Sequence, residues 1–192
     1  MMKNIAVFAS GSGTNAENIV NHFADNRNIR IVLILSNKKD SGVLNKAKKL
    51  GVEHAFIDNK NIKDGDFLIR YLSDYNIDLI VLAGFLALIP PQLVNAYKNR
   101  IINIHPALLP KYGGKGMYGD RVHRSVLNNK DAESGISIHY VNEKYDEGNI
   151  ILQARCPVHS NDTPETLADR IHKLEYRYYP QCIEQLIDLD LI

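Results

Sequence analysis

Asn103 and His105 are the two residues of this chain whose types and spacing best suit chemistry. They belong to the end of an apolar run, Ile101–Ile104, and Pro106 follows them. Because Pro106 has no backbone donor and keeps His105 extended, the pattern predicts a buried strand that ends at a sheet edge. Side chains two positions apart on a strand point the same way, so both would face one cleft. An amide donor beside an imidazole can hold an oxyanion and supply its proton.

A carboxylate follows later in the chain, at Asp146 in the segment Tyr145–Gly148. By itself this segment is typical of an ordinary turn. A carboxylate placed beside an imidazole favours its charged form, so we expect Asp146 to keep His105 cationic.

A glycine-rich turn, Gly11–Asn15, follows the first apolar run and opens a segment of helical composition. Glycine lets the backbone approach a ligand closely, and the amides at a helix N-terminus favour an anion. A dinucleotide-binding loop would need an acidic residue at the end of the second strand, where this chain has Ser36–Lys39. The pattern therefore favours a single phosphate over NAD. A tight turn that binds nothing is the remaining alternative.

Apolar runs of strand length alternate with helical segments through the first 105 residues. The predicted strands are Ile5–Ala9, Ile31–Leu35, His54–Ile57, Leu79–Ala83 and Ile101–Ile104. The predicted helices are Asn15–Ala24, Ser41–Leu50, Ile62–Tyr75 and Pro91–Lys98. Such alternation implies parallel strands joined by right-handed crossovers. We therefore expect an α/β fold with one doubly wound, mostly parallel sheet.

The second half changes character. A glycine-rich stretch at Lys111–Gly119 precedes a short amphipathic segment that runs from Asp120 to Leu127. Gly135–Val141 alternates as a strand, and Ile150–Ala154 follows as a second one. Thr163 with Pro164 after it is an N-cap that opens a last helix. We expect the two strands to continue the same sheet, in one domain without a linker.

Composition excludes several classes of protein. An apolar fraction of 45% and a charged fraction of 23% are those of an ordinary globular protein, and a net charge of +1 gives no bulk attraction to nucleic acid or to a membrane. Cys156 and Cys182 are too far apart for a CxxC module, and the seven histidines lack metal-binding spacing. The first apolar run is too short for a membrane span. These features predict a cytoplasmic protein whose partners are small molecules.

Four segments together resemble the folate-dependent formyltransferases, and above all the phosphoribosylglycinamide formyltransferase family of purine biosynthesis. They are Gly11–Asn15, Leu82–Leu86, Asn103–Pro110 and Ser137–Gln153. The resemblance runs from Ile5 to about Pro180. It implies a Rossmann-like fold and a single formyltransferase domain over residues 1–192. Residues 1–105 would form the phosphate-binding half, and residues 106–192 the folate-binding and C-terminal half.

The resemblance implies transfer of the formyl group of 10-formyltetrahydrofolate to the amine of glycinamide ribonucleotide, without a metal. His105 would be the general acid, Asn103 would bind the formyl oxygen and Asp146 would support the histidine. Residues implied in binding the ribonucleotide are Gly11, Ser12, Gly13, Thr14, Asn15, Pro106 and Glu175. Residues implied in binding the folate are Leu86, Ala87, Leu88, Ile89, Asn103, Val141 and Asp146.

The chain departs from the family pattern in three places. A family arginine that contacts the folate tail would fall near Asn61, where only Lys60 and Lys63 are basic, and Ala87 replaces a residue that is often basic. The Gly113–Gly119 loop is longer than in compact members. Two alternatives stay open: formyl transfer to another amine, such as a charged tRNA or a nucleotide sugar, and a non-catalytic Rossmann-type nucleotide-binding module. A monomer and a homodimer fit the sequence equally well.

Overall fold

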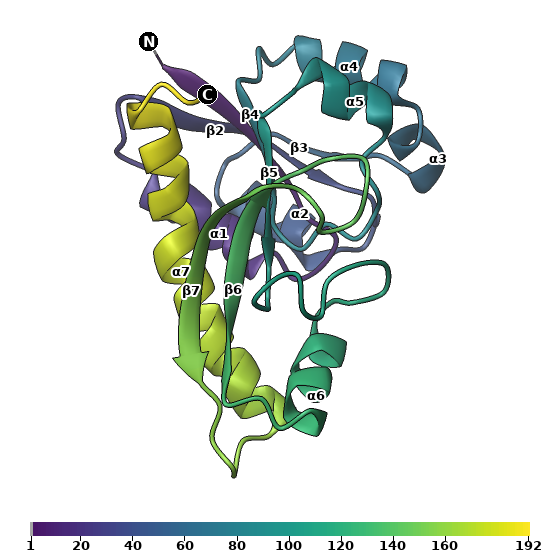
Figure 1. Ribbon diagram of the computed structural model, residues 1–192. Coiled ribbons are helices and arrows are strands. Elements are labelled where there is room, and N and C mark those ends of the chain that lie inside the picture. Colours follow the sequence, from purple (N-terminus) through teal and green to yellow (C-terminus); the bar gives the residue numbers. More distant parts are fainter. Residues whose placement is uncertain (1) are drawn as a thin grey trace.

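Seven strands form a single sheet in the computed structural model of the chain, which describes residues 2–192 (Figure 1). They lie in the order β3-β2-β1-β4-β5-β6-β7. Strands β1 to β5 pair in parallel, whereas β6 and β7 extend the sheet as antiparallel strands. Their bounds are β1 Lys3–Phe8, β2 Ile29–Ser36, β3 His54–Phe56, β4 Leu79–Leu82, β5 Ile101–His105, β6 Glu133–Tyr140 and β7 Ile150–Pro157. The predicted doubly wound, mostly parallel α/β sheet is confirmed, including its continuation into the second half.

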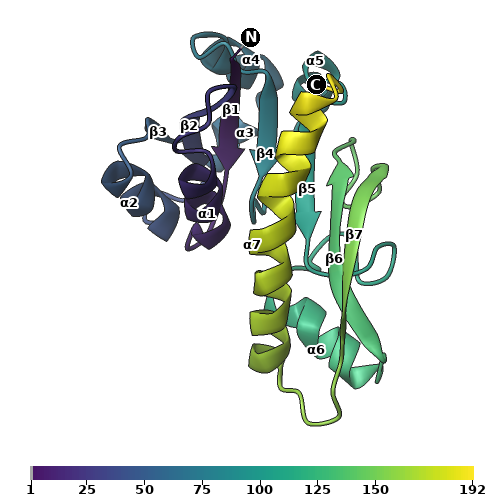
Figure 2. The ribbon, with the colours of Figure 1, turned by 90° about the vertical axis from the view of Figure 1, so that its left-hand side faces the viewer.

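Helices cover both faces of this sheet (Figure 2). The helices α1, α2 and α7 pack on one face, and α3, α4 and α5 pack on the other. Helix α6 packs against α7. The helices span α1 Thr14–His22, α2 Gly42–Lys49, α3 Asn59–Ile62, α4 Gly65–Ser73, α5 Pro91–Ala96, α6 Asp120–Asn128 and α7 Pro164–Asp188.

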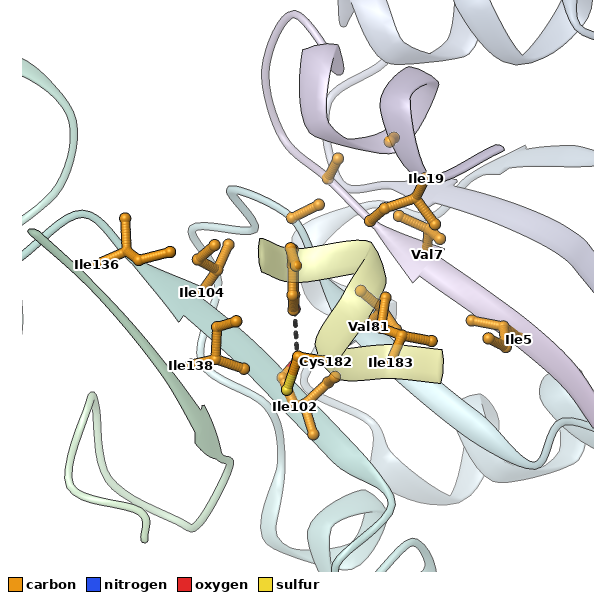
Figure 3. Packing of buried hydrophobic residues seen from close by; sticks show 14 of the residues in the cluster. Ile5, Val7, Ile19, Val81, Ile102, Ile104, Ile136, Ile138, Cys182 and Ile183 are labelled. Atoms are coloured by element: carbon orange, nitrogen blue, oxygen red, sulfur yellow. Dashed lines mark hydrogen bonds between the residues drawn. The ribbon is translucent and has the colours of Figure 1, made fainter. Parts of the chain in front are cut away.

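Strand β1 shows why the central strands are apolar without alternation. Ile5 and Val7 point into the core beneath α1 and α7, while Ala6 and Phe8 point into the core on the opposite face. Because successive side chains of a strand face opposite sides, a strand covered on both faces must be apolar throughout. Figure 3 shows the first of these cores, where Ile5 and Val7 lie in the same cluster as Ile183 of α7.

The helix predicted over Ile62–Tyr75 is wrong in its extent, because α4 covers only Gly65–Ser73 and a separate short helix, α3, precedes it at Asn59–Ile62. The Asp58 carboxylate accepts hydrogen bonds from the backbone N–H groups that open α3, and Asp64 accepts one from Phe67 at 2.9 Å to open α4. A side-chain cap at Asp64 satisfies amides that the helix itself leaves free, so the chain restarts there as a second helix.

Helix α7 begins as predicted, with Thr163 as N-cap, and forms a capping box with Thr166. It continues through Pro180, which has no N–H to donate to the carbonyl of Tyr176 one turn earlier. The side-chain amide of Asn18 in α1 donates to that carbonyl at 2.9 Å. This contact joins α7 to α1 beside the loop that follows β1.

No helix within residues 2–192 is long and apolar enough to cross a bilayer. Cys156 and Cys182 are both buried free thiols. Burial raises the pKa of Cys182 to about 11, so its thiol stays protonated at neutral pH.

Candidate active site

A cleft with a volume of about 600 Å³ opens at the carboxyl ends of the central strands. Strands β1 and β4 are neighbours, and the connection that follows β1 leads to β2 on one side while the connection that follows β4 leads to β5 on the other, so a crevice forms at this point of the sheet. We call this crevice the main cleft. Its walls include Gly11–Asn15, Ala83–Leu86, Asn103–Pro106, Gly114–Gly119, His123, Asp146 and Glu175.

The structure brings Asn103, His105 and Asp146 together in the main cleft. One carboxylate oxygen of Asp146, Oδ2, lies 3.5 Å from Nδ1 of His105. The other oxygen, Oδ1, accepts a long hydrogen bond of 3.4 Å from Nδ2 of Asn103. Asn103 and His105 do face the same side of β5, and the distant Asp146 reaches them from the loop between β6 and β7.

His139 is a fourth member of this cluster, and no role for it is predicted from the sequence. It lies opposite Asn103 in the antiparallel pair of β5 and β6, and it is only 2% exposed. Its Nδ1 lies 2.8 Å from the carbonyl oxygen of Tyr140, and its Nε2 lies 3.0 Å from Nδ2 of Asn103. The carbonyl can only accept, so Nδ1 carries the proton and Nε2 accepts from Asn103. His139 therefore fixes the orientation of the amide, whose other N–H makes the long contact with Asp146.

The expectation that Asp146 keeps His105 cationic is wrong in its net effect. Burial lowers the pKa of His105, and this exceeds the opposing effects of the Asp146 charge and of the hydrogen bond to the Tyr112 carbonyl. His105 is only 3% exposed, and taking an imidazolium out of water disfavours its charged form. Nε2 of His105 donates to the carbonyl of Tyr112 at 2.8 Å. The resting imidazole is thus neutral, with Nδ1 unprotonated and turned toward Asp146.

Asp146 is held as an anion in spite of its burial. Burial tends to raise the pKa of this carboxyl, but His139 and His105 in their charged forms, together with the backbone N–H of Gly114, lower it by more. The bond from Gly114 to Oδ2 is 2.9 Å long. An anion with fixed donors in a cleft is a group that can hold or pass a proton.

Ser137 holds the turn that follows His105. Its hydroxyl donates to the carbonyl of Ala107 at 2.7 Å and accepts from the backbone N–H of Leu109 at 2.9 Å. The Gln153 amide donates to the same hydroxyl at 2.8 Å. These bonds lock the segment after β5, so the imidazole is presented on a rigid support.

The glycine loop, Gly11–Asn15, leads from β1 into α1 as predicted, with Gly13 as N-cap at a φ of 76°. Within residues 2–192, the backbone N–H groups of Gly13, Thr14 and Asn15 donate to no backbone carbonyl. They stay free to bind an anion in the main cleft. A Cβ on Gly13 would lie 2.5 Å from Cγ2 of Val43, so α2 occupies the space beside this glycine.

Asn37 follows β2, at the place where a dinucleotide-binding site would have an acidic residue. Asn37 accepts a hydrogen bond of 2.5 Å from the Ser10 hydroxyl, and Ser10 in turn accepts one from the backbone N–H of Leu86 at 2.9 Å. Instead of binding a ribose, as an acidic residue would in a dinucleotide site, Asn37 holds Ser10 at the start of the glycine loop.

Glu175 of α7 closes the far side of the main cleft. Its carboxylate accepts a hydrogen bond of 2.8 Å from Nδ2 of Asn15, which joins α7 to the glycine loop. Burial raises the pKa of Glu175, while the Asn15 bond and the nearby His172 lower it by less. Glu175 is thus a buried polar group that faces a cleft, where a hydroxyl is a suitable partner.

A second surface, which we call the apolar groove, joins the main cleft at Asn103 and Asp146. It is lined by Leu82, Phe85, Ala87, Leu88, Ile89, Asn103, His139, Val141, Asn142, Lys144, Tyr145 and Asp146. All the residues implied in folate binding line this groove except Leu86, which lines the main cleft. The groove and the cleft therefore meet at the polar cluster.

Within residues 2–192, no group of three or more His, Cys, Asp or Glu side chains is arranged to hold a metal ion.

Comparison with known proteins identifies the family. The family model described as "Formyl transferase" matches residues 3–183. The phosphoribosylglycinamide formyltransferase of Bacillus subtilis is 36% identical over 194 residues, which cover 98% of this chain and 97% of the Bacillus protein. The chloroplastic enzyme of Arabidopsis thaliana is 42% identical over 187 residues, which cover 94% of this chain. The chain spans only 64% of the Arabidopsis protein and 61% of its Vigna unguiculata counterpart.

Solved structures agree with the sequence comparison. The phosphoribosylglycinamide formyltransferase of Streptococcus pneumoniae TIGR4 is similar with a TM-score of 0.85 and 36% identity, over 97% of this chain and 99% of that one. The enzyme of Anaplasma phagocytophilum is similar with a TM-score of 0.88 and 31% identity, over 99% of this chain and 89% of that one. The resemblance noted in the sequence is confirmed: the chain belongs to the formyl transferase family, among the phosphoribosylglycinamide formyltransferases.

Proposed function

We propose that this chain transfers the formyl group of 10-formyltetrahydrofolate to the amine of glycinamide ribonucleotide. The observation that carries the proposal is the placement of Asn103, His105 and Asp146 where the main cleft meets the apolar groove. A transferase must bring two substrates to one set of reacting groups, and this junction provides such a place. Membership of the family supports the identity of both substrates.

In this proposal Asn103 stabilises the charge that develops on the formyl oxygen when the amine adds to the formyl carbon. His139 already engages one N–H of the amide at 3.0 Å. The other makes only the 3.4 Å contact with Asp146, so an oxyanion can replace that weaker partner. A donor fixed before the reaction costs little reorganisation when the charge appears.

The neutral His105 then moves one proton. The amine loses a proton as its new bond to the formyl carbon forms, and Nδ1 of His105 accepts it with Asp146 at 3.5 Å as the counter-charge. The resulting imidazolium is the general acid that returns the proton to the nitrogen that leaves the formyl carbon. The lowered pKa of His105 supports both steps, since the histidine starts neutral and gives up its proton readily.

The ribonucleotide lies in the main cleft in this proposal. The free amides of Gly13, Thr14 and Asn15 bind its phosphate, and Glu175 accepts from a ribose hydroxyl. Gly11, Ser12 and Pro106 line the same cleft and complete the subsite. The amine of the ribonucleotide would then point toward His105.

The folate lies along the apolar groove. Ala87, Leu88, Ile89 and Val141 offer it an apolar wall, and Asn103 and Asp146 meet its formyl end. Leu86 would contact it from the side of the main cleft. Apolar walls with a few convergent polar groups are typical of sites for ring-shaped ligands.

We further propose that residues 1–192 act as one formyltransferase domain, although residue 1 lies outside the described part of the chain. The sheet runs through both halves, and each proposed subsite draws on both: Ala87 and Val141 line the groove, whereas Asn15 and Glu175 meet in the cleft. A net charge of +1 favours small-molecule partners over nucleic acid or a membrane. We propose a cytoplasmic enzyme that is a monomer or a homodimer.

The proposal is tested by incubating the purified chain with 10-formyltetrahydrofolate and each of several amines, and measuring formylated product by mass spectrometry. We expect turnover with glycinamide ribonucleotide and none with a charged tRNA or an amino sugar nucleotide. Turnover with one of the other amines alone would assign a different acceptor. Binding of the ribonucleotide without turnover would favour the non-catalytic nucleotide-binding module.

A further inference from the structure

The loop Lys115–Gly119, which we call the cleft loop, has no role in the function proposed so far. It connects the catalytic cluster to α6, and all five of its residues line the main cleft. It belongs to the glycine-rich stretch Lys111–Gly119. Because the loop forms a wall of the cleft, it places its side chains beside the substrate.

Both ends of the cleft loop are held. At its base the backbone N–H of Gly114 donates to Asp146 at 2.9 Å, so the loop begins at a catalytic carboxylate. At its far end the guanidinium of Arg121 lies 5.6 Å from the ring centroid of Tyr118. Gly116, between these ends, has a φ of 87°, which favours glycine and lets the backbone turn sharply. The loop therefore has contacts at both ends and a sharp turn at Gly116 between them.

Lys115 is the cation that this wall carries. It is exposed, it lines the main cleft, and none of the ion pairs formed within residues 2–192 includes it. The glycine loop, which lines the same cleft, offers an anion only neutral amides. Lys38, just after β2, is the other lysine that lines this cleft, and it too is exposed and takes part in none of these ion pairs. A phosphate carries nearly two negative charges, so amides alone leave much of its charge without a cationic partner.

The position of Lys115 distinguishes between the two anionic parts of the substrates. Lys115 and the glycine loop line the main cleft, in which the ribonucleotide phosphate is placed. Lys115 does not line the apolar groove, whose cation is Lys144. We therefore expect Lys144 of the groove, and not Lys115 of the cleft loop, to bind the carboxylates of a folate tail.

We propose that Lys115 is a specificity-determining residue that binds the phosphate of the ribonucleotide from the side of the cleft loop. Its ammonium supplies a positive charge, whereas the glycine loop supplies only uncharged backbone amides. The inference rests on the proposed function for the identity of the ribonucleotide. The shared chemistry, an ammonium that binds a phosphate monoester on a five-carbon sugar, can be tested without turnover.

Calorimetry tests this with Lys115→Gln, Lys115→Arg and the control Lys49→Gln, which removes an exposed lysine of α2 that lines none of these cavities. The ligands are glycinamide ribonucleotide, its dephosphorylated riboside and ribose 5-phosphate. Lys115→Gln should weaken binding of both phosphorylated ligands roughly tenfold or more, as expected for one charge-assisted hydrogen bond. Binding of the riboside and of the folate should not change, and Lys115→Arg should restore most of the affinity.

Equal losses for the ribonucleotide and the riboside, or a loss confined to the folate, would overturn the assignment of Lys115. So would unchanged binding of ribose 5-phosphate to Lys115→Gln. The proposed function fails in a different way, through absence of formyl transfer by the unmodified chain. The steady-state readout adds a further distinction, because the inference predicts a raised KM for the ribonucleotide with kcat nearly unchanged.

Discussion

The two ends of the main cleft are built from different parts of the polypeptide. At the glycine loop the useful groups are backbone amides, and side chains such as Ser10 and Asn37 only hold the loop in place. At the polar cluster the useful groups are the side chains of Asn103, His105, His139 and Asp146. A backbone site binds a charge but cannot exchange a proton, whereas imidazole and carboxylate groups can.

This difference predicts how substitutions divide between binding and chemistry. Changes in the polar cluster should lower kcat with little effect on the affinity for the ribonucleotide. Changes in the glycine loop should raise KM and leave kcat nearly as it was. The four predictions that follow test this division, in order of decreasing effect.

The largest effect is expected for His105→Ala, which removes the group that accepts and returns the proton. We expect kcat to fall by about 10²- to 10⁴-fold, the range for loss of a general acid and base. Ribonucleotide binding measured by calorimetry should change little, because the glycine loop is intact. A variant with nearly normal kcat would remove His105 from the chemistry.

Asn103→Ala should lower kcat by about 10²- to 10³-fold, since the oxyanion loses its side-chain donor. The measurement is kcat together with the folate KM. His139→Gln serves as a partial control, because its amide can still accept from Asn103 and should cost less. If the two variants lost the same activity, the amide of Asn103 would not be the group that matters.

Asp146→Asn should lower kcat by about 10²-fold and also shift the pH profile. The Asp146 charge raises the pKa of His105, although burial lowers it by more. Without that charge the pKa of His105 falls further, so the acid-side decline of kcat/KM should move to lower pH. An acid limb that stays in place, or moves to higher pH, would contradict the coupling of these two residues.

The smallest of the four effects concerns the glycine loop. Gly13 is not a suitable position for this test, because a side chain there would collide with Val43 and disturb α2. A Cβ added to Gly11 would have no neighbouring heavy atom within 4 Å, so Gly11→Val should fold normally, with its side chain filling part of the cleft. We expect the KM for the ribonucleotide to rise about tenfold at nearly constant kcat. A lowered kcat with unchanged KM would place this loop in the chemistry.

Much of the fold followed from the sequence because the central strands are covered on both faces and their buried parts are therefore apolar without alternation, as in Ile5–Phe8 of β1 and in all of β4. The helix predicted over Ile62–Tyr75 begins too early, since Asp64 caps α4 within the apolar pattern, and the short helix α3 before it is not predicted. Helix boundaries depend on such single side-chain contacts, which periodicity alone does not reveal.

The site could be predicted only in part. Asn103 and His105 were evident because they share one strand, but His139 became significant only through the register that pairs it with Asn103. Its place on an alternating strand with Ser137 was the one available signal. The charge state of His105 depends on burial from several elements at once, which explains why a carboxylate neighbour alone gave the wrong expectation.

A single-turnover experiment with an isotopically labelled formyl group tests the central claim most directly. The chain in excess would be mixed with labelled 10-formyltetrahydrofolate and glycinamide ribonucleotide, and the label followed by mass spectrometry in wild type, His105→Ala and Gly11→Val at saturating ribonucleotide. The account predicts rapid transfer of the label in wild type and Gly11→Val, and almost none in His105→Ala. Equal rates in wild type and His105→Ala, or no transfer by wild type, would contradict it.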